Sequence, residues 1–128
     1  TAYICTTPVS PALAAGALAA LGILQSDTAL HKVLRANIQA VREILLSHNI
    51  HTNNTITPIF AFTIGDDSDM QSIEHELLNA GILLPLMRYP NGPAPLYFRL
   101  AVNAMHTDAQ LTQLDHALTK ALACENAS

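Results

Sequence analysis

The feature that most constrains the fold is an uninterrupted apolar run at residues 12–24, where every residue is hydrophobic or glycine. A membrane-spanning helix needs about twenty such residues, so this run is too short to cross a bilayer. Pro11 suits the first turn of a helix and Ser10 suits its N-cap, so the run predicts a helix that begins there. A helix without a polar face is normally buried on every side. A chain of 128 residues can hardly surround such a helix by itself.

The composition points the same way. Half of the residues are hydrophobic and 12% are charged, whereas about a quarter are charged in a typical soluble domain. We therefore expect the chain to cover much of its surface in an oligomer, or to be part of a larger protein. A net charge of -4 without a basic run argues against nucleic acid as a partner.

The cysteines and the N-terminal residues bear on where in the cell the protein is found. Cys5 and Cys124 lie near opposite ends of the chain and suggest neither a disulfide framework nor a metal site. Two such cysteines fit a reducing compartment. No basic segment precedes the apolar run, so the run does not resemble a signal peptide. The expected location is cytoplasmic.

The hydrophobic patterns predict two parts. A lead-in and an interdomain alanine-rich helix occupy residues 1–26, and a small α+β domain occupies residues 27–128. The expected order is helix, helix, strand, helix, strand, strand, helix, with strands at 59–64, 82–87 and 96–102. Pro85 makes the second strand an edge strand or interrupts it. This order indicates a small three-stranded, mainly antiparallel sheet with helices covering one face.

Polar residues mark where two of these helices begin. Ser68 with Gln71, and Thr107 with Gln110, have the spacing of a capping box. Gly81 is a natural stop for the first of these helices. His106 precedes the second box, so we expect it to order that turn rather than to bind a metal.

One residue of the strand at 96–102 is not explained by packing. The residues expected on its buried face are Leu96, Phe98, Leu100 and Val102. Arg99 lies on the opposite face, in a chain with only six lysines and arginines. A guanidinium can grip a carboxylate or phosphate through two parallel hydrogen bonds, so Arg99 is a candidate anion site. The alternative is a solvent-facing or salt-bridged strand residue.

A second arginine, Arg88, precedes a proline-rich loop that leads into the Arg99 strand. A tight loop between adjacent strands could bring both guanidiniums to one mouth and form a joint anion site. The spacing alone also allows two unrelated arginines.

Other residue types that carry chemistry form no recognisable site. The six histidines include no third ligand at a metal-binding spacing. Asp66, Asp67 and Asp69 do not follow the pattern of a calcium loop. No serine, cysteine or threonine lies in a nucleophile motif. We therefore expect neither a metal site nor a complete catalytic apparatus in this chain.

Short motifs recur along the whole chain in an order typical of one enzyme family. They are Thr6-Thr7 before Val9-Ser10-Pro11 and the alanine-rich run, then Gly65-Asp66, Gly81-Ile82, Arg88-Tyr89-Pro90, Arg99-Leu100 and Asn103-Ala104-Met105-His106-Thr107. This set resembles the region that follows the cofactor lysine in the α-oxoamine synthases. These are pyridoxal 5'-phosphate enzymes of fold type I, among them 8-amino-7-oxononanoate synthase, glycine C-acetyltransferase and serine palmitoyltransferase.

The resemblance implies roles for five residues. Arg99 matches the arginine that binds the α-carboxylate of the amino-acid substrate. Arg88 matches an arginine at the active-site mouth, nearer the acyl substrate, and Asn91 lies near a position that contacts substrate. The loop from Arg88 to Arg99 is one residue shorter than the family pattern. Thr6 and Thr7 match a polar pair that reaches the cofactor phosphate across a homodimer.

The resemblance also implies what lies elsewhere. The family's Schiff-base lysine, its aspartate for the pyridine nitrogen and its stacking histidine precede the region that this chain matches. The chain then corresponds to the C-terminal small domain of an enzyme that condenses an amino acid with an acyl-CoA. Alone it is expected to be inactive and without bound cofactor, because the large cofactor domain is its missing partner. Two alternatives stay open: a domain of a class I/II aminotransferase, and a stand-alone α+β module that binds a carboxylate.

Overall fold

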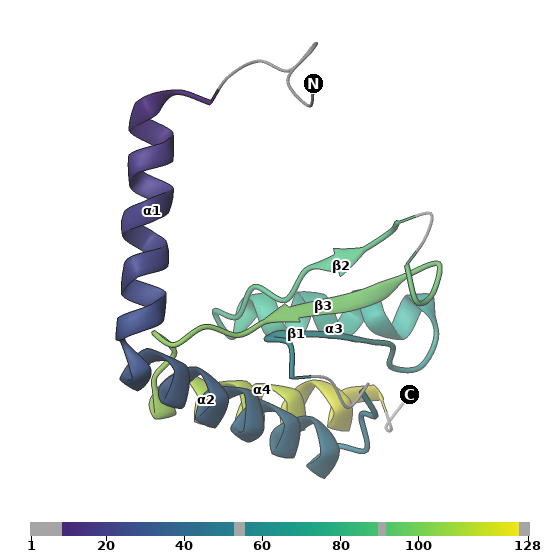
Figure 1. Cartoon of the computed structure of the whole chain (residues 1–128). Coiled ribbons are helices and arrows are strands. Elements are labelled where there is room, and N and C mark those ends of the chain that lie inside the picture. The colour runs from purple at the N-terminus through teal and green to yellow at the C-terminus, as the bar shows by residue number, and fades with distance from the viewer. Residues whose placement is uncertain (1–8, 53–55, 90–91, 126–128) are drawn as a thin grey trace. The chain divides into compact units, whose positions relative to one another are not determined.

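The computed structural model describes residues 9–52, 56–89 and 92–125 (Figure 1). Its elements are α1 (Pro11–Ser26), α2 (Thr28–Ser47), β1 (Ile59–Phe62), α3 (Asp67–Asn79), β2 (Leu86–Met87), β3 (Tyr97–Ala101) and α4 (Asp108–Glu125). The order predicted from the sequence is confirmed. The chain divides into two compact units, residues 1–32 and 33–128, and the division falls within α2.

The apolar helix α1 begins where the sequence predicts, with Pro11 in its first turn. Ser10 occupies the N-cap position, but its side chain makes no capping hydrogen bond. No residue of α1 is buried, so the described part of the chain does not supply the surfaces that an all-apolar helix requires. Among the described residues, α1 and α2 reach the length and apolarity of a membrane span only when taken together, across the break at Asp27.

The sheet is antiparallel and has the strand order β1-β3-β2. The short strand β2 forms one edge, and Pro85 explains why it starts at Leu86 rather than at residue 82. The carbonyl of Pro85 still accepts a hydrogen bond from the Arg99 N–H at 3.1 Å. The other two strands are also shorter than predicted: β1 ends at Phe62 and β3 begins at Tyr97.

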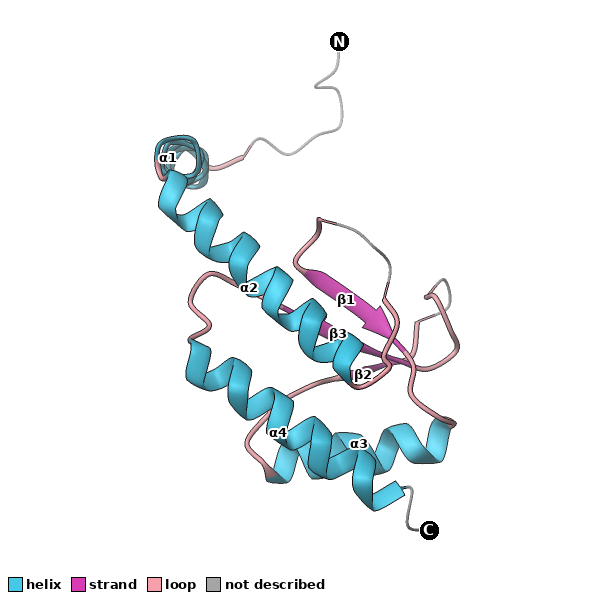
Figure 2. Ribbon diagram, turned by 90° about the horizontal axis from the view of Figure 1, so that it is seen from below, coloured by secondary structure: helices cyan, strands magenta, loops and turns pink. Residues whose placement is uncertain are grey.

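Alternation along the strands separates a packed face from an open face. Phe60, Phe62, Phe98 and Leu100 are buried in the core, and the rings of Phe62 and Phe98 lie 5.6 Å apart. Apolar residues of α2, α3 and α4 pack against this face: Ile38, Val41, Leu45, Met70, Ile73, Leu77, Leu111, Leu114 and Leu118. Figure 2 shows these helices on the side of the sheet from which it is viewed. The α+β architecture with helices covering one face is therefore confirmed.

The two predicted capping boxes have different outcomes. At α4 the box forms as expected, because Thr107 N–H donates to Gln110 and Gln110 N–H donates to Thr107 Oγ1, at 3.0 and 3.3 Å. At α3 the prediction of Ser68 with Gln71 is wrong. Asp66 accepts from the backbone N–H of Ser68 and Asp69, and Asp69 accepts from the N–H of Asp66. A carboxylate is the better cap because the N-terminus of a helix favours negative charge.

A buried asparagine joins α2 to the connection between β3 and α4. Asn37 is the one buried polar residue among those the structure describes. Its Nδ2 donates to the carbonyls of Asn103 and His106, both at 3.0 Å. His106 Nδ1 accepts from the Asn103 N–H at 3.4 Å, which agrees with its expected role in this turn. The bridge links residues far apart in sequence, so no local sequence pattern predicts it.

This bridge generates a stability prediction. Replacing Asn37 by Leu keeps a branched side chain with the same number of heavy atoms but removes both hydrogen bonds, which should lower the free energy of unfolding by about 1–3 kcal/mol. Urea denaturation of the whole chain measures the change. Asn79→Leu is the matched control, because Asn79 is exposed at the end of α3 and surface changes usually stay within about 0.5 kcal/mol. Equal losses in both variants would contradict a structural role for the bridge.

Candidate functional site

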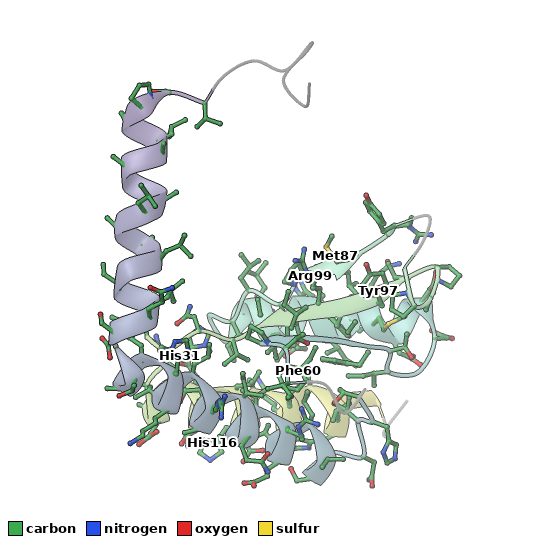
Figure 3. All side chains as sticks on the ribbon, viewed as in Figure 1. His31, Phe60, Met87, Tyr97, Arg99 and His116 are labelled. Atoms are coloured by element: carbon green, nitrogen blue, oxygen red, sulfur yellow. The ribbon has the colours of Figure 1, made fainter. Side chains whose placement is uncertain are left out.

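Arg99 lies in the middle of β3 with its side chain on the open face of the sheet. Figure 3 shows Arg99 and Phe60 on opposite sides of the sheet. Its backbone is fixed on both sides, by the pairing with Ala61 of β1 and by the hydrogen bond to Pro85. The sequence prediction of an exposed arginine on a rigid strand is confirmed, since residue 99 is exposed while its neighbours Phe98 and Leu100 are buried.

The charge of Arg99 is not neutralised in the described part of the chain. The ion pairs there join Arg88 to Asp67, Lys120 to Glu76 and His48 to Asp115. Arg99 belongs to none of them, which removes the salt-bridged alternative for the described residues. A permanently charged guanidinium without a carboxylate partner is available to an external anion.

A cavity of about 540 Å³ adjoins Arg99. It lies between β3, the segment 81–85 and the start of α4, and its walls are largely apolar, with Leu83, Leu84 and Leu100 among them. No acidic residue lines it, and His106, Gln110 and Gln113 add polar groups. Cavities for small ligands typically measure about 300–1,000 Å³ and combine apolar walls with few polar groups. The arrangement suits a ligand with an anionic group beside an apolar part.

Arg88 lies in a different environment. It lines a second pocket with residues 89 and 92–95, while Arg99 lines only the first. Its guanidinium is 3.7 Å from Asp67 at the start of α3, and both side chains are exposed. The structure therefore does not bring Arg88 and Arg99 to the entrance of one pocket. The substrate-contacting role of Arg88 stays a prediction.

The proline-rich loop is held against the Arg99 strand by a close contact that the sequence did not reveal. Gly92 packs on the ring of Tyr97, and a side chain at position 92 would collide with that ring. The N–H of Gly92 also donates to the carbonyl of Tyr89 at 3.0 Å, which closes a turn. Tyr97 is buried outside the main core. The contact thus holds Gly92 against Tyr97, which lies two residues before Arg99 in β3.

The remaining candidates are absent from the site or outside the described residues. Thr6, Thr7 and Asn91 lie outside the described residues. Within residues 9–52, 56–89 and 92–125, no group of three or more His, Cys, Asp or Glu side chains is placed to hold a metal ion. His48 bonds instead to Asp115 at 2.8 Å and ties the end of α2 to α4.

Comparison with known proteins gives a consistent result. No protein-family profile matches the chain. The 8-amino-7-oxononanoate synthase of Pseudomonas putida is 32% identical over 119 residues, which cover 92% of this chain and 30% of that protein. Serine palmitoyltransferase from S. paucimobilis, solved as a variant with a bound PLP–myriocin aldimine, has a TM-score of 0.84 at 22% identity. The 8-amino-7-oxononanoate synthase of Francisella tularensis has a TM-score of 0.78 at 21% identity.

The extent of these matches shows which part of the similar proteins this chain corresponds to. The two structural comparisons cover 98% and 97% of this chain, but 32% and 36% of the matched chains. The chain thus spans about a third of the length of the proteins that it resembles. Nearly full coverage on this side, at 32% sequence identity and with a shared fold, makes the chain a C-terminal portion of a protein of the α-oxoamine synthase family.

Proposed function

We propose that this chain is the domain that binds the substrate carboxylate in a pyridoxal phosphate-dependent acyltransferase. The proposed reaction joins an amino acid to an acyl-CoA with loss of carbon dioxide. The observation that carries the proposal is Arg99, an exposed arginine on a paired strand backbone, with no acidic partner among the described residues and beside a largely apolar cavity. Its position also matches the carboxylate-binding arginine that the sequence resemblance implies.

Arg99 would act by fixing the orientation of the amino acid. Two parallel hydrogen bonds from the guanidinium hold a carboxylate in one plane, which a lysine ammonium cannot do. The pairing of β3 with β1 and the contact with Pro85 keep the arginine backbone from moving with the ligand. The carboxylate is thereby placed so that the rest of the amino acid reaches the reacting centre in one orientation.

The described residues do not fit the cofactor by themselves. Lys32 is exposed on α2, and Lys120 is exposed and pairs with Glu76 at 3.7 Å. When bound to an enzyme, pyridoxal phosphate supplies an electron sink for carbanion chemistry. The lysine that carries it would come from the large domain of the longer protein. Thr6 and Thr7 would contact its phosphate across a homodimer.

The apolar helix α1 would serve as the contact with that large domain. Its exposed side chains include Leu13, Leu18, Leu21, Ile23 and Leu24, each more than half exposed. Such an apolar surface is normally covered in a folded protein. Arg88 and Asn91 would lie nearer the acyl substrate, at the entrance to the site. We therefore expect this chain to be inactive without the large domain of the longer protein.

The first prediction concerns Arg99. In the longer protein, Arg99→Ala should raise the KM for the amino acid, since losing one partner of a charged hydrogen-bonded pair costs about 2–5 kcal/mol. Steady-state kinetics with varied amino acid measures the change. Arg35→Ala is the control, because Arg35 is exposed on α2. An unchanged KM in the Arg99 variant would remove this residue from the substrate site.

A second prediction concerns the cofactor. The 128-residue chain mixed with pyridoxal phosphate should show no stoichiometric aldimine absorbance near neutral pH, because its exposed lysines have ordinary access to water and hold no cofactor in place. An unrelated protein with a similar lysine content is the reference. A stoichiometric band that disappears in the Lys120→Arg variant would show that the chain holds the cofactor by itself.

A third prediction separates the acyltransferase from an aminotransferase, whose substrate is also a carboxylate. The longer protein should release free CoA from an acyl-CoA in the presence of an amino acid, and should not convert a 2-oxo acid into an amino acid. A thiol assay and amino-acid analysis measure the two reactions. Amino-group transfer without CoA release would identify an aminotransferase and leave the role of Arg99 unaffected.

A further inference from the structure

Two neighbours of Arg99 on the open face of the sheet are small. Ala61 is its direct partner across the β1–β3 pair, and Ala101 lies two residues along the same strand. Side chains directly opposite in an antiparallel pair have Cβ atoms about 5 Å apart. These two positions therefore determine how much space surrounds the stem of the arginine side chain.

Larger residues lie on the other sides of Arg99 and further along this face. Tyr97 is two residues from Arg99 in the other direction along β3, and Pro85 accepts the hydrogen bond from the Arg99 N–H on the side of β2. Ile59 is opposite Ala101, and Met87 of β2 is opposite Tyr97. Figure 3 labels Arg99, Met87 and Tyr97 on the same side of the sheet. The open face thus has small residues beside the arginine at Ala61 and Ala101, and larger ones at Tyr97 and Pro85. The arginine is therefore least crowded on the side of the two alanines, of which Ala101 lines the cavity beside it.

Sheet formation does not explain the two alanines. Strands favour β-branched and aromatic residues, and alanine is depleted in them. The packed face of the same strands follows that preference, with Phe60 on β1 and Phe98 on β3. Ala61 is half-buried and Ala101 is exposed, so neither is small because the core requires it. The space that they leave adjoins the one unpaired guanidinium of the sheet.

We propose that Ala61 and Ala101 control access to Arg99. With alanine at both positions, a carboxylate can reach the guanidinium in its own plane and form two hydrogen bonds. A leucine at either position would pack along the aliphatic stem of the arginine and occupy the space that the carboxylate enters. The inference rests on the proposed function, in that the ligand of Arg99 is taken to be the substrate carboxylate.

The kinetic test uses the longer protein with Ala61→Leu and Ala101→Leu. Both variants should raise the KM for the amino acid by about tenfold and leave kcat nearly unchanged, which is the pattern expected when ground-state binding is lost. Ala109→Leu is the matched control, because Ala109 is an exposed residue of α4. Melting temperatures of all three variants test whether the fold is retained. Alanine variants that keep the wild-type KM while Arg99→Ala raises it would overturn the proposal.

A second measurement separates this proposal from the proposed reaction. Phenylglyoxal modifies accessible guanidiniums, and mass spectrometry gives the rate at each arginine of the 128-residue chain. In Ala61→Leu and in Ala101→Leu, Arg99 should lose most of its reactivity, while the exposed Arg35 keeps its rate as an internal reference. Unchanged reactivity of Arg99 in both variants would overturn the access role. Lost reactivity together with a normal KM in Arg99→Ala would keep the access role and reject the substrate role.

Discussion

The structure of residues 33–128 depends on the packing of three helices against one face of a short sheet. Phe98 is fully buried at the centre of that face and contacts Phe62 across the strand pair. The sheet is small, and β2 contributes only two residues to it. Its strands therefore depend on the apolar contacts beneath them more than on their own hydrogen bonds, because short hairpins are marginal in water.

The same packing places the functional candidate. A strand alternates its side chains, so burying Phe98 and Leu100 requires Arg99 to lie on the opposite face. The helices of residues 33–128 pack against the other face, and the largest polar group of the open face is a guanidinium without an acidic partner among the described residues. The packed face fixes the strand backbone, and the open face carries the guanidinium.

Much of the fold could be predicted because its signals are local. The element order, the edge character of β2, the capping box at Thr107 and the exposure of Arg99 all follow from residues close together in sequence. The cap of α3 was misjudged for a local reason as well. Asp66 and Asp69 lie in the same short segment as Ser68, and Asp66 takes the N-cap position. Its carboxylate is charged, and Gly65 before it adopts a positive φ.

The sequence by itself determined which elements form, which strand face is buried and that Arg99 is exposed, since periodicity and capping act within one element. The tertiary structure alone decided the bridge from Asn37 to residues 103 and 106, the contact of Gly92 with Tyr97 and the separation of Arg88 from Arg99. It also decided that Ala61 stands beside Arg99. Each of these depends on strand register or helix docking, which bring together residues distant in sequence and so leave no local pattern.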